Sequence, residues 1–89
     1  MFNKRRSEIQ IIGEIINLSK GGAKKTEILY QTNMSYSQLQ HYLTYLLEKD
    51  ILKQDTKTNA NGTSIQIFVT TEKGTNLSGD IDKLFKYFK

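Results

Sequence analysis

The chain contains no cysteine, no proline and no tryptophan, and it has one histidine among its 89 residues. Without cysteine it has neither a disulfide nor a thiolate metal ligand, and one histidine cannot supply the three or four ligands that zinc needs. Nucleophilic catalysis lacks support, because every serine has only that histidine as a base. The glycines also lack the spacing of a phosphate-binding loop. The sequence therefore predicts a protein that is not an enzyme and holds no metal or cofactor.

Long hydrophobic runs are missing as well. Residues 1–20 lack the uninterrupted apolar stretch of a signal peptide or a transmembrane helix. The lack of cysteine permits a reducing compartment, so we expect a cytoplasmic protein with no membrane partner. With 37% hydrophobic residues, the chain fits one small domain with a thin core. Burial between two subunits would supplement such a core, and a homodimer is expected.

Basic residues exceed acidic ones, with 13 Lys and Arg against 9 Asp and Glu, a net charge of +4 and a pI near 9.4. This balance modestly favours a polyanionic partner. The excess lies in residues 1–25, where only Glu8 and Glu14 oppose the basic residues Lys4, Arg5, Arg6, Lys20, Lys24 and Lys25. We therefore expect the positive field to centre on the start of the first helix and on the connection that follows it.

Apolar residues at helical spacing predict three helices in the first half of the chain. The first covers Ser7–Ser19 and is ended by Gly21-Gly22, and the second covers Thr26–Thr32. Ser35 caps the third, and Gln38 completes a capping box three residues later. The apolar residues of the first helix are Ile9, Ile12, Ile15, Ile16 and Leu18, and one side of the third helix carries Leu39, Tyr42, Leu43, Leu46 and Leu47.

Two strands and a last helix follow. Branched and aromatic residues predict strands at Ile51–Gln54 and Ile65–Val69, and the polar stretch Asp55–Ser64 should protrude between them with its turn at Asn61-Gly62. Thr71 caps the last helix. A seam of Leu77, Ile81, Leu84, Phe85 and Phe88 on that helix either dimerises the protein or docks onto its own core. We expect dimerisation, because large aromatic residues crowd the end of a small chain.

The helix pair joined by Thr32-Asn33-Met34 has the form of a helix-turn-helix, and the hairpin after it has the form of a wing. The major groove of DNA admits one α-helix. The outward residues near the start of the third helix would then reach base edges, and they are Tyr36, Ser37, Gln38, Gln40, His41 and Thr44. Because Ser35–Glu48 contains no Arg or Lys, the commonest guanine contact is missing, and selectivity should be weak to moderate. Phosphate contacts fall to Arg5, Arg6, Lys24 and Lys25, with Lys53 and Lys57 on the wing.

These segments resemble the archaeal winged helix-turn-helix family that includes the 10a chromatin proteins. The resemblance covers nearly the whole chain and is carried by Arg5–Ile9, Gly21–Thr26, Met34–Leu39, Tyr42-Leu43 and Thr71–Gly74. It implies an α+β winged helix with a three-helix core, a hairpin wing and a C-terminal helix. It also implies binding to double-stranded DNA, dimerisation through the last helix, and a role in chromatin organisation or transcription. Ser35–Gln38, Gln40 and His41 match the groove-facing segment of this family.

Residues 1–74 are thus expected to form the winged helix-turn-helix domain, and residues 75–89 a C-terminal helix for dimerisation, in a protein located at the nucleoid. A second hypothesis is a winged-helix module that binds another protein, because this fold serves both purposes and the third helix carries little charge. An effector-gated sensor has little support, since 89 residues leave no second domain and show no evident polar pocket. No small-molecule ligand is expected, and a dimer interface is the remaining place that such a ligand could occupy.

Overall fold

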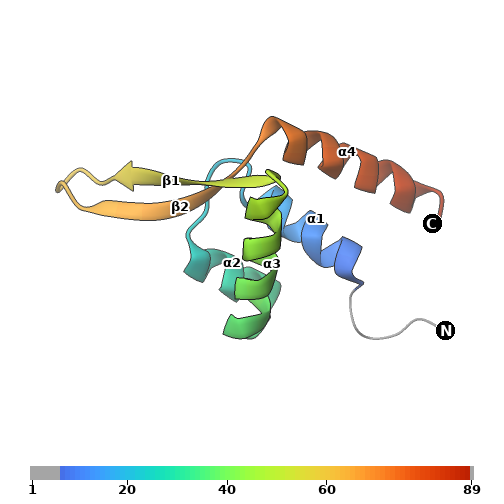
Figure 1. Ribbon diagram of the computed structural model, residues 1–89, viewed down its shortest axis with the longest axis horizontal. Helices are drawn as coiled ribbons and strands as arrows, with labels where there is room; N and C mark the ends of the chain where they lie inside the picture. Colours follow the sequence, from blue (N-terminus) through green and yellow to red (C-terminus); the bar gives the residue numbers. More distant parts are fainter. Residues whose placement is uncertain (1–6, 89) are drawn as a thin grey trace.

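Side-chain caps begin three of the four helices in the computed structural model, which describes residues 7–88. Ser7 and Ser35 each form a capping box, in which the serine hydroxyl accepts the backbone N–H of Gln10 or Gln38 at 3.2 Å and the glutamine side chain returns a bond to the serine N–H. Thr71 caps the last helix by accepting the Gly74 N–H at 3.0 Å. In chain order the elements are α1 (Glu8–Leu18), α2 (Lys25–Thr32), α3 (Tyr36–Glu48), β1 (Leu52–Thr58), β2 (Ser64–Thr70) and α4 (Glu72–Lys86) (Figure 1).

The predicted range of the first helix, Ser7–Ser19, agrees with α1 and its two caps, but the residue that ends the helix differs from the prediction. The helix stops at Leu18 with Ser19 as its cap, before the glycine pair that was expected to end it. The Ser19 N–H already bonds the carbonyl oxygens of Ile15 and Ile16, which closes the last turn without a glycine. Gly22 takes φ +91° within the following turn. There the added Cβ of any other residue would lie 2.9 Å from Cδ1 of Ile67.

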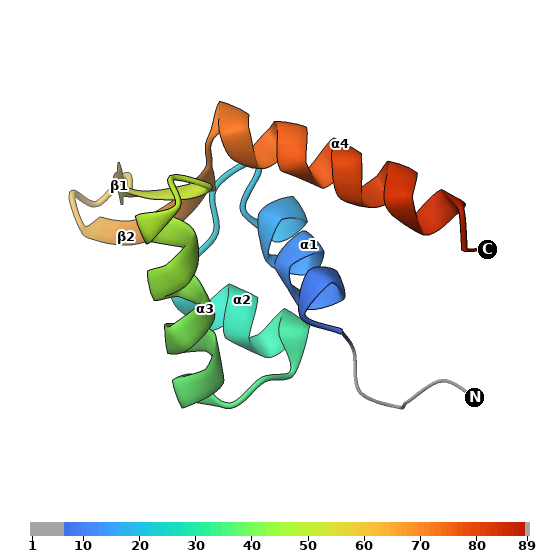
Figure 2. The ribbon, with the colours of Figure 1, turned by 45° about the vertical axis from the view of Figure 1, so that its right-hand side comes forward.

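The hairpin is longer than predicted. β1 and β2 pair antiparallel from Leu52↔Thr70 to Thr58↔Ser64, so residues 55–58, predicted as part of the connection, continue the strand. Main-chain pairing with β2 extends through these residues although their side chains are exposed. The turn is left with residues 59–63, where Gly62 takes φ +86° as the predicted Asn61-Gly62 turn requires. The hairpin projects away from the helices, and the predicted protrusion is confirmed (Figures 1 and 2).

The core lies where the helices meet the base of the hairpin. Its buried apolar side chains are Ile15, Ile16, Ala23, Ile28, Leu39, Leu43, Leu46, Ile51, Leu52, Phe68 and Ile81. Ala23 also joins the sheet, because its N–H donates to Phe68 O at 2.9 Å and its carbonyl accepts the Phe68 N–H at 2.8 Å. Ile9 and Leu18, counted with the apolar face of the first helix, stand at its two ends and remain exposed.

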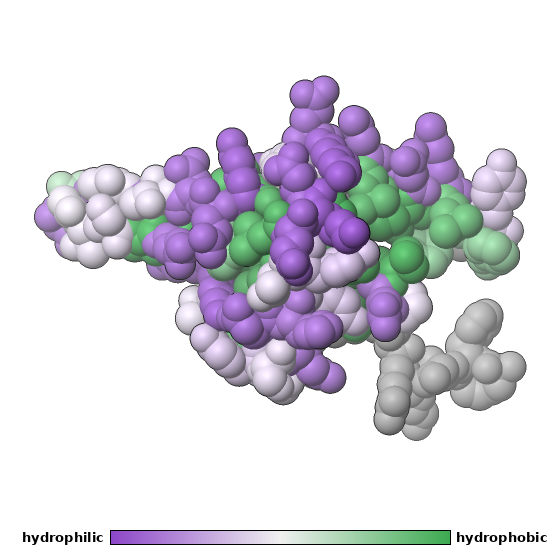
Figure 3. Space-filling model, viewed as in Figure 1, coloured by the Kyte–Doolittle hydropathy of each residue, from purple (hydrophilic) through white to green (hydrophobic). Residues whose placement is uncertain are grey.

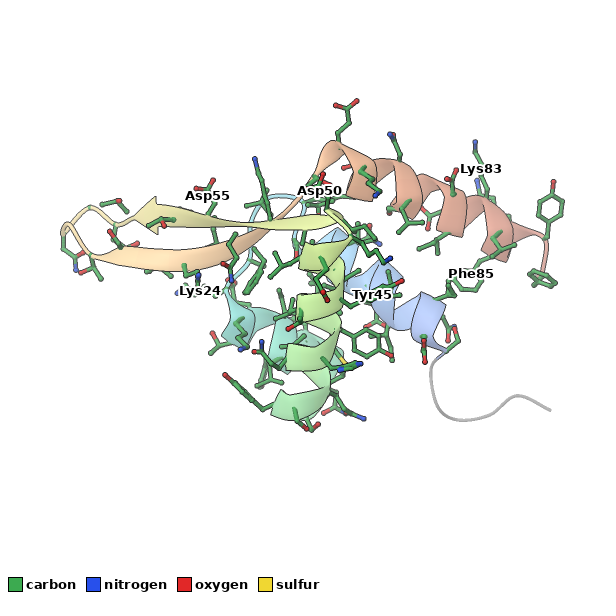
Figure 4. All side chains as sticks on the ribbon, in the orientation of Figure 1. Lys24, Tyr45, Asp50, Asp55, Lys83 and Phe85 are labelled. Carbon is green, nitrogen blue, oxygen red and sulfur yellow. The ribbon has the colours of Figure 1, made fainter. Side chains whose placement is uncertain are left out.

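The predicted seam of α4 divides between two environments. Ile81 is buried, and Leu77 and Phe85 pack against the core. Phe85 lies on the side of α4 that faces α1 (Figure 4). Leu84 and Phe88 stay exposed, at 47% and 76%. Docking onto the chain's own core therefore accounts for three residues of the seam. The division predicted after residue 74 falls inside α4.

Candidate nucleic-acid interface

The two sides of α3 differ sharply. Leu39, Leu43 and Leu46 are buried against the core, which fixes the helix in place. Seven residues on its start and outer side are all exposed, and we call them the α3 face: Ser35, Tyr36, Ser37, Gln38, Gln40, His41 and Thr44. They are the residues singled out from the sequence. The free side of α3 and the hairpin lie on the same side of the molecule, and α1 and α4 lie on the other (Figure 2).

Part of the α3 face is occupied in holding the helix start. The Gln38 amide oxygen accepts the Ser35 N–H at 3.2 Å, and the Ser35 hydroxyl accepts the Gln38 N–H. That hydroxyl also lies 3.5 Å from the Ser37 hydroxyl. Tyr36, Gln40, His41 and Thr44 follow one another along the helix at spacings that keep them on neighbouring positions of one side. These four residues form the part of the face that is best placed to reach a ligand.

Lys25 and Lys24 have different environments although they are adjacent in sequence. Lys24 is exposed, whereas Lys25 is half-buried and turns toward α3. Its ammonium donates to the Tyr36 hydroxyl at 2.9 Å and to the Gln40 amide oxygen, and it lies 4.4 Å from the centroid of the Tyr36 ring. The two lysines were predicted as equivalent phosphate contacts. The structure shows that their side chains have different partners.

The wing lysines are exposed. Lys53 and Lys57 alternate with Asp55 along β1, so all three side chains share one face of the hairpin. Lys57 and Lys24 line the same hollow of about 240 Å³ between the hairpin and the start of α2, together with Glu27, Asn59, Ile65 and Ile67. The sequence did not predict this hollow, because it depends on how the hairpin lies over α2.

Tyr45 extends the α3 face and was not among the DNA contacts predicted from the sequence. It lies one turn beyond His41, it is 46% exposed, and Lys49 Nζ stands 5.7 Å from its ring centroid. The i, i+4 spacing of His41, Tyr45 and Lys49 was the signal available in the sequence. Arg5 and Arg6, the other predicted phosphate contacts, lie outside the described residues. His41 is exposed, and residues 7–88 contain no group of three His, Asp or Glu that is able to hold a metal ion.

Hydrophilic and hydrophobic residues are unevenly distributed over the face shown in Figure 3. The α3 region is white to purple in Figure 3, whereas hydrophobic atoms gather over the end of α4. The large apolar side chains exposed there are Leu84, Tyr87 and Phe88. None of the helices within residues 7–88 has the length and apolar character needed to cross a membrane.

Comparison with known proteins identifies the family to which this arrangement of helices and hairpin belongs. A family model described as winged helix-turn-helix matches residues 5–89. A protein of Methanocaldococcus jannaschii, described as uncharacterized, is 30% identical over 83 residues, which are 92% of this chain and 35% of that protein. The chain therefore spans about a third of the length of this curated relative.

Several solved structures have the same fold. Sso10a-2, a DNA-binding protein from Sulfolobus solfataricus, matches with a TM-score of 0.73 and 24% identity, over 92% of this chain and 81% of its own. A PadR-like transcription factor from Bacteroides fragilis matches with a TM-score of 0.73 and 19% identity, over 89% and 82%. ZitR from Lactococcus lactis matches with a TM-score of 0.68 and 15% identity, over 99% and 62%. The predicted α+β winged helix and the resemblance to the 10a proteins are confirmed.

Proposed function

Because this chain belongs to the winged helix-turn-helix family, we propose that it binds double-stranded DNA as a transcriptional regulator or nucleoid-associated protein. In this proposal α3 enters the major groove and the β1–β2 hairpin acts as a wing against the flanking backbone. The observation that carries it is the exposed α3 face, which is polar from Ser35 to Thr44 and is backed by a buried apolar side.

The dimensions of α3 support this mode. Its 13 residues give a rod about 20 Å long, and a major groove about 12 Å wide accepts one helix with its side chains. In a helix-turn-helix the second helix contacts base edges with its N-terminal residues, and in this chain α3 is the second helix of the pair. The residues nearest the bases would therefore be those of the first turns, including Tyr36, Gln40 and His41.

Weak to moderate sequence selectivity follows from the side chains available. Gln40 can pair with adenine through two hydrogen bonds, and the Ser37 and Thr44 hydroxyls can accept or donate. Gln38 contributes less, because its amide oxygen is bonded to the helix start. With no Arg or Lys in α3, the strong bidentate contact to guanine is missing. Most of the affinity would come from phosphates.

Exposed lysines around the α3 face would supply the phosphate contacts. Lys24 precedes α2, and Lys53 and Lys57 lie on the wing. Lys24 and Lys57 border one hollow, so they would approach neighbouring parts of one backbone. Arg5 and Arg6 are proposed as further contacts from the sequence alone. Each phosphate that is neutralised releases condensed counterions, which makes such binding sensitive to salt.

A homodimer formed through the end of α4 is the second part of the proposal. Leu84 and Phe88 are four residues apart and exposed, and hydrophobic residues are visible at this end of the molecule (Figure 3). A two-fold pair can read two half-sites on one face of a duplex when its recognition helices stand about 34 Å apart. The exposed residues Ile9 and Tyr87 are candidates to extend this contact beyond the predicted seam.

A salt titration of duplex binding tests the proposal. With four to six phosphates neutralised per subunit, log K should fall with log salt at a slope of about −4 to −5 per subunit. Lys24→Ala and Lys57→Ala should each reduce that slope by about one. Lys83→Ala is the matched control, because Lys83 is an exposed lysine on the side of α4 that faces away from the body (Figure 4). The proposed surface is contradicted if the affinity for duplex DNA does not change with salt, or if all three substitutions change the salt slope equally.

The alternative of a protein-binding module has one observation in its favour. Tyr30, Tyr36 and Tyr45 are exposed on α2 and α3 at 86%, 62% and 46%, and tyrosine is enriched at protein interfaces. A contact centred on these rings would respond weakly to salt, and it would be lost in Tyr30→Ala or Tyr45→Ala rather than in the lysine variants. The same titration thus separates the two functions.

A further inference from the structure

We propose that Lys25 is a positioning residue for base readout: it holds the Gln40 amide and the Tyr36 ring in one fixed arrangement on the α3 face. The inference rests on the proposed DNA binding and adds to it what selects the sequence. It also gives Lys25 a role distinct from that of Lys24, its exposed neighbour.

The contacts of the Lys25 ammonium are directed at α3. Lys25 is the first residue of α2, and its Nζ bonds both the Tyr36 hydroxyl, at 2.9 Å, and the Gln40 Oε1. The same Nζ stands 4.4 Å from the Tyr36 ring centroid. An ammonium has three donors, so two are already used within the protein. Lys24 is exposed, and its side chain is the better placed of the two to meet a phosphate.

The consequence for Gln40 is a defined amide orientation. An ammonium can only donate, so the atom that faces Lys25 must be the amide oxygen. The amide nitrogen then points along the helix and donates to Thr44 Oγ1 at 3.3 Å. Thr44 in turn donates from that hydroxyl to the Gln40 carbonyl oxygen at 2.9 Å. The oxygen and the nitrogen of the Gln40 amide each have a fixed partner, so the two atoms cannot exchange places without loss of these hydrogen bonds.

This orientation matters for what Gln40 can read. Adenine presents an acceptor at N7 and a donor at N6 in the major groove, and a glutamine amide must match both at once. With Oε1 held on the Lys25 side and Nε2 on the Thr44 side, the amide fits adenine in one direction along the groove. Fixing the amide before binding also lowers the entropy lost when it binds. The cluster would thus favour one orientation of an A·T pair over its inverse.

A variant that removes the donors and keeps the stem isolates this role. Lys25→Met retains an unbranched apolar side chain, and Lys24→Met makes the same charge change on the adjacent, exposed residue. Both are compared with wild type on an array that contains every eight-base-pair duplex, at two salt concentrations. In parallel, the Gln40 side-chain amide signals are followed by NMR in the free proteins, with thermal melting as the check on folding.

For wild type we expect inversion of the preferred A·T pair to weaken binding roughly 5- to 150-fold, the range of one bidentate contact. Lys25→Met should bring that ratio close to one and make the Gln40 amide more mobile. Lys24→Met should leave the ratio and the amide unchanged, weaken all duplexes alike and reduce the salt slope by about one. Lys25→Arg, which keeps the charge with a different donor geometry, should preserve the salt slope and still change the ratio.

The outcomes that overturn the inference are distinct from failure of the proposed function. If Lys25→Met keeps the wild-type preferences and lowers the salt slope as Lys24→Met does, Lys25 is a phosphate contact and the inference is wrong. Unchanged preferences with an unchanged Gln40 amide also overturn it. If wild type binds no duplex on the array, the proposed function fails, and the inference about readout fails with it.

Discussion

The backbone of Gly74 lies directly against the carbonyl oxygen of Ile51. A Cβ at residue 74 would overlap that oxygen and lie 2.8 Å from Cγ2 of Thr70. The same carbonyl accepts the N–H of Thr71 at 3.0 Å, and the Thr71 hydroxyl donates to Asp50 O at 2.7 Å. The start of α4 is thereby joined to the segment between α3 and β1, and glycine is required where the two backbones meet.

Gly74→Ala should therefore destabilise the fold, and Gly79→Ala should stabilise it. Overpacking at a rigid backbone contact costs about 1–3 kcal/mol of unfolding free energy. Gly79 belongs to the same helix but meets nothing within 4 Å of an added Cβ, so alanine there should gain about 0.5–1 kcal/mol from helix propensity. Urea unfolding of both variants measures the difference, and equal effects would contradict the contact.

Stability at alkaline pH should depend on Tyr42. Burial raises the pKa of the Tyr42 phenol above its ordinary value of 10.0, and the negative charge of Glu8 raises this pKa further. The folded state thus favours the neutral phenol, whereas the unfolded chain loses the proton near the ordinary value. The stabilisation that comes from keeping this phenol neutral is fully present below the ordinary tyrosine pKa. It is lost as the pH rises from there through the higher pKa of the folded state.

Tyr42→Phe should reduce this alkaline loss, because phenylalanine has no proton to release. Urea midpoints measured at neutral pH and above the ordinary tyrosine pKa give the comparison. Tyr30→Phe, which alters a phenol that is 86% exposed, is the control and should lose stability as wild type does. An alkaline loss in Tyr42→Phe as large as that of wild type would contradict the prediction.

Much of the fold was predictable because its signals are local. The capping box of Ser35, which was predicted, needs only a glutamine three residues later, and the box of Ser7, which was not predicted, has the same local signal. Asn33 takes φ 55° at the end of α2 as its residue type allows. The ends of β1 were not predictable in the same way, since residues 55–58 are polar and join the strand through pairing with β2. Periodicity located an apolar stripe on α4. It did not reveal that Ile81 would be covered by the chain itself.

In the candidate site, too, local features were predictable from the sequence and contacts between distant residues were not. The outward side of α3 follows from a period of 3.6 residues, so the exposed residues from Ser35 to Thr44 were identified from the sequence. Contacts between elements depend on the angle of α2 to α3 and on the path of the hairpin. The partners of Lys25, 11 and 15 residues away, and the shared hollow of Lys24 and Lys57 therefore required the structure.

The two capping serines offer a matched test of α3. Ser7→Ala and Ser35→Ala each remove one capping box and should each cost about 1 kcal/mol of unfolding free energy. Only Ser35 begins the helix that carries the α3 face. We therefore expect Ser35→Ala to weaken duplex binding more than Ser7→Ala at equal stability, measured by fluorescence anisotropy. Equal loss of binding in both variants would indicate a general effect of stability.

The mass in solution tests the proposed dimer. Sedimentation equilibrium of wild type should give twice the chain mass of 10.3 kDa. Changing Leu84 and Phe88 together to Lys should yield monomers, because charged groups at these exposed positions oppose burial between two chains. The fold should survive, since the buried Ile81 is untouched.

Tyr30→Lys is the control for that double variant, as it places a charge on an exposed aromatic residue of α2 instead of α4. This variant should remain dimeric. Loss of the dimer should also halve the total salt slope of duplex binding, because one subunit then neutralises only its own phosphates. A wild-type mass of one chain at the highest soluble concentration would contradict the dimer, and an unchanged mass in the double variant would place the contact elsewhere on the surface.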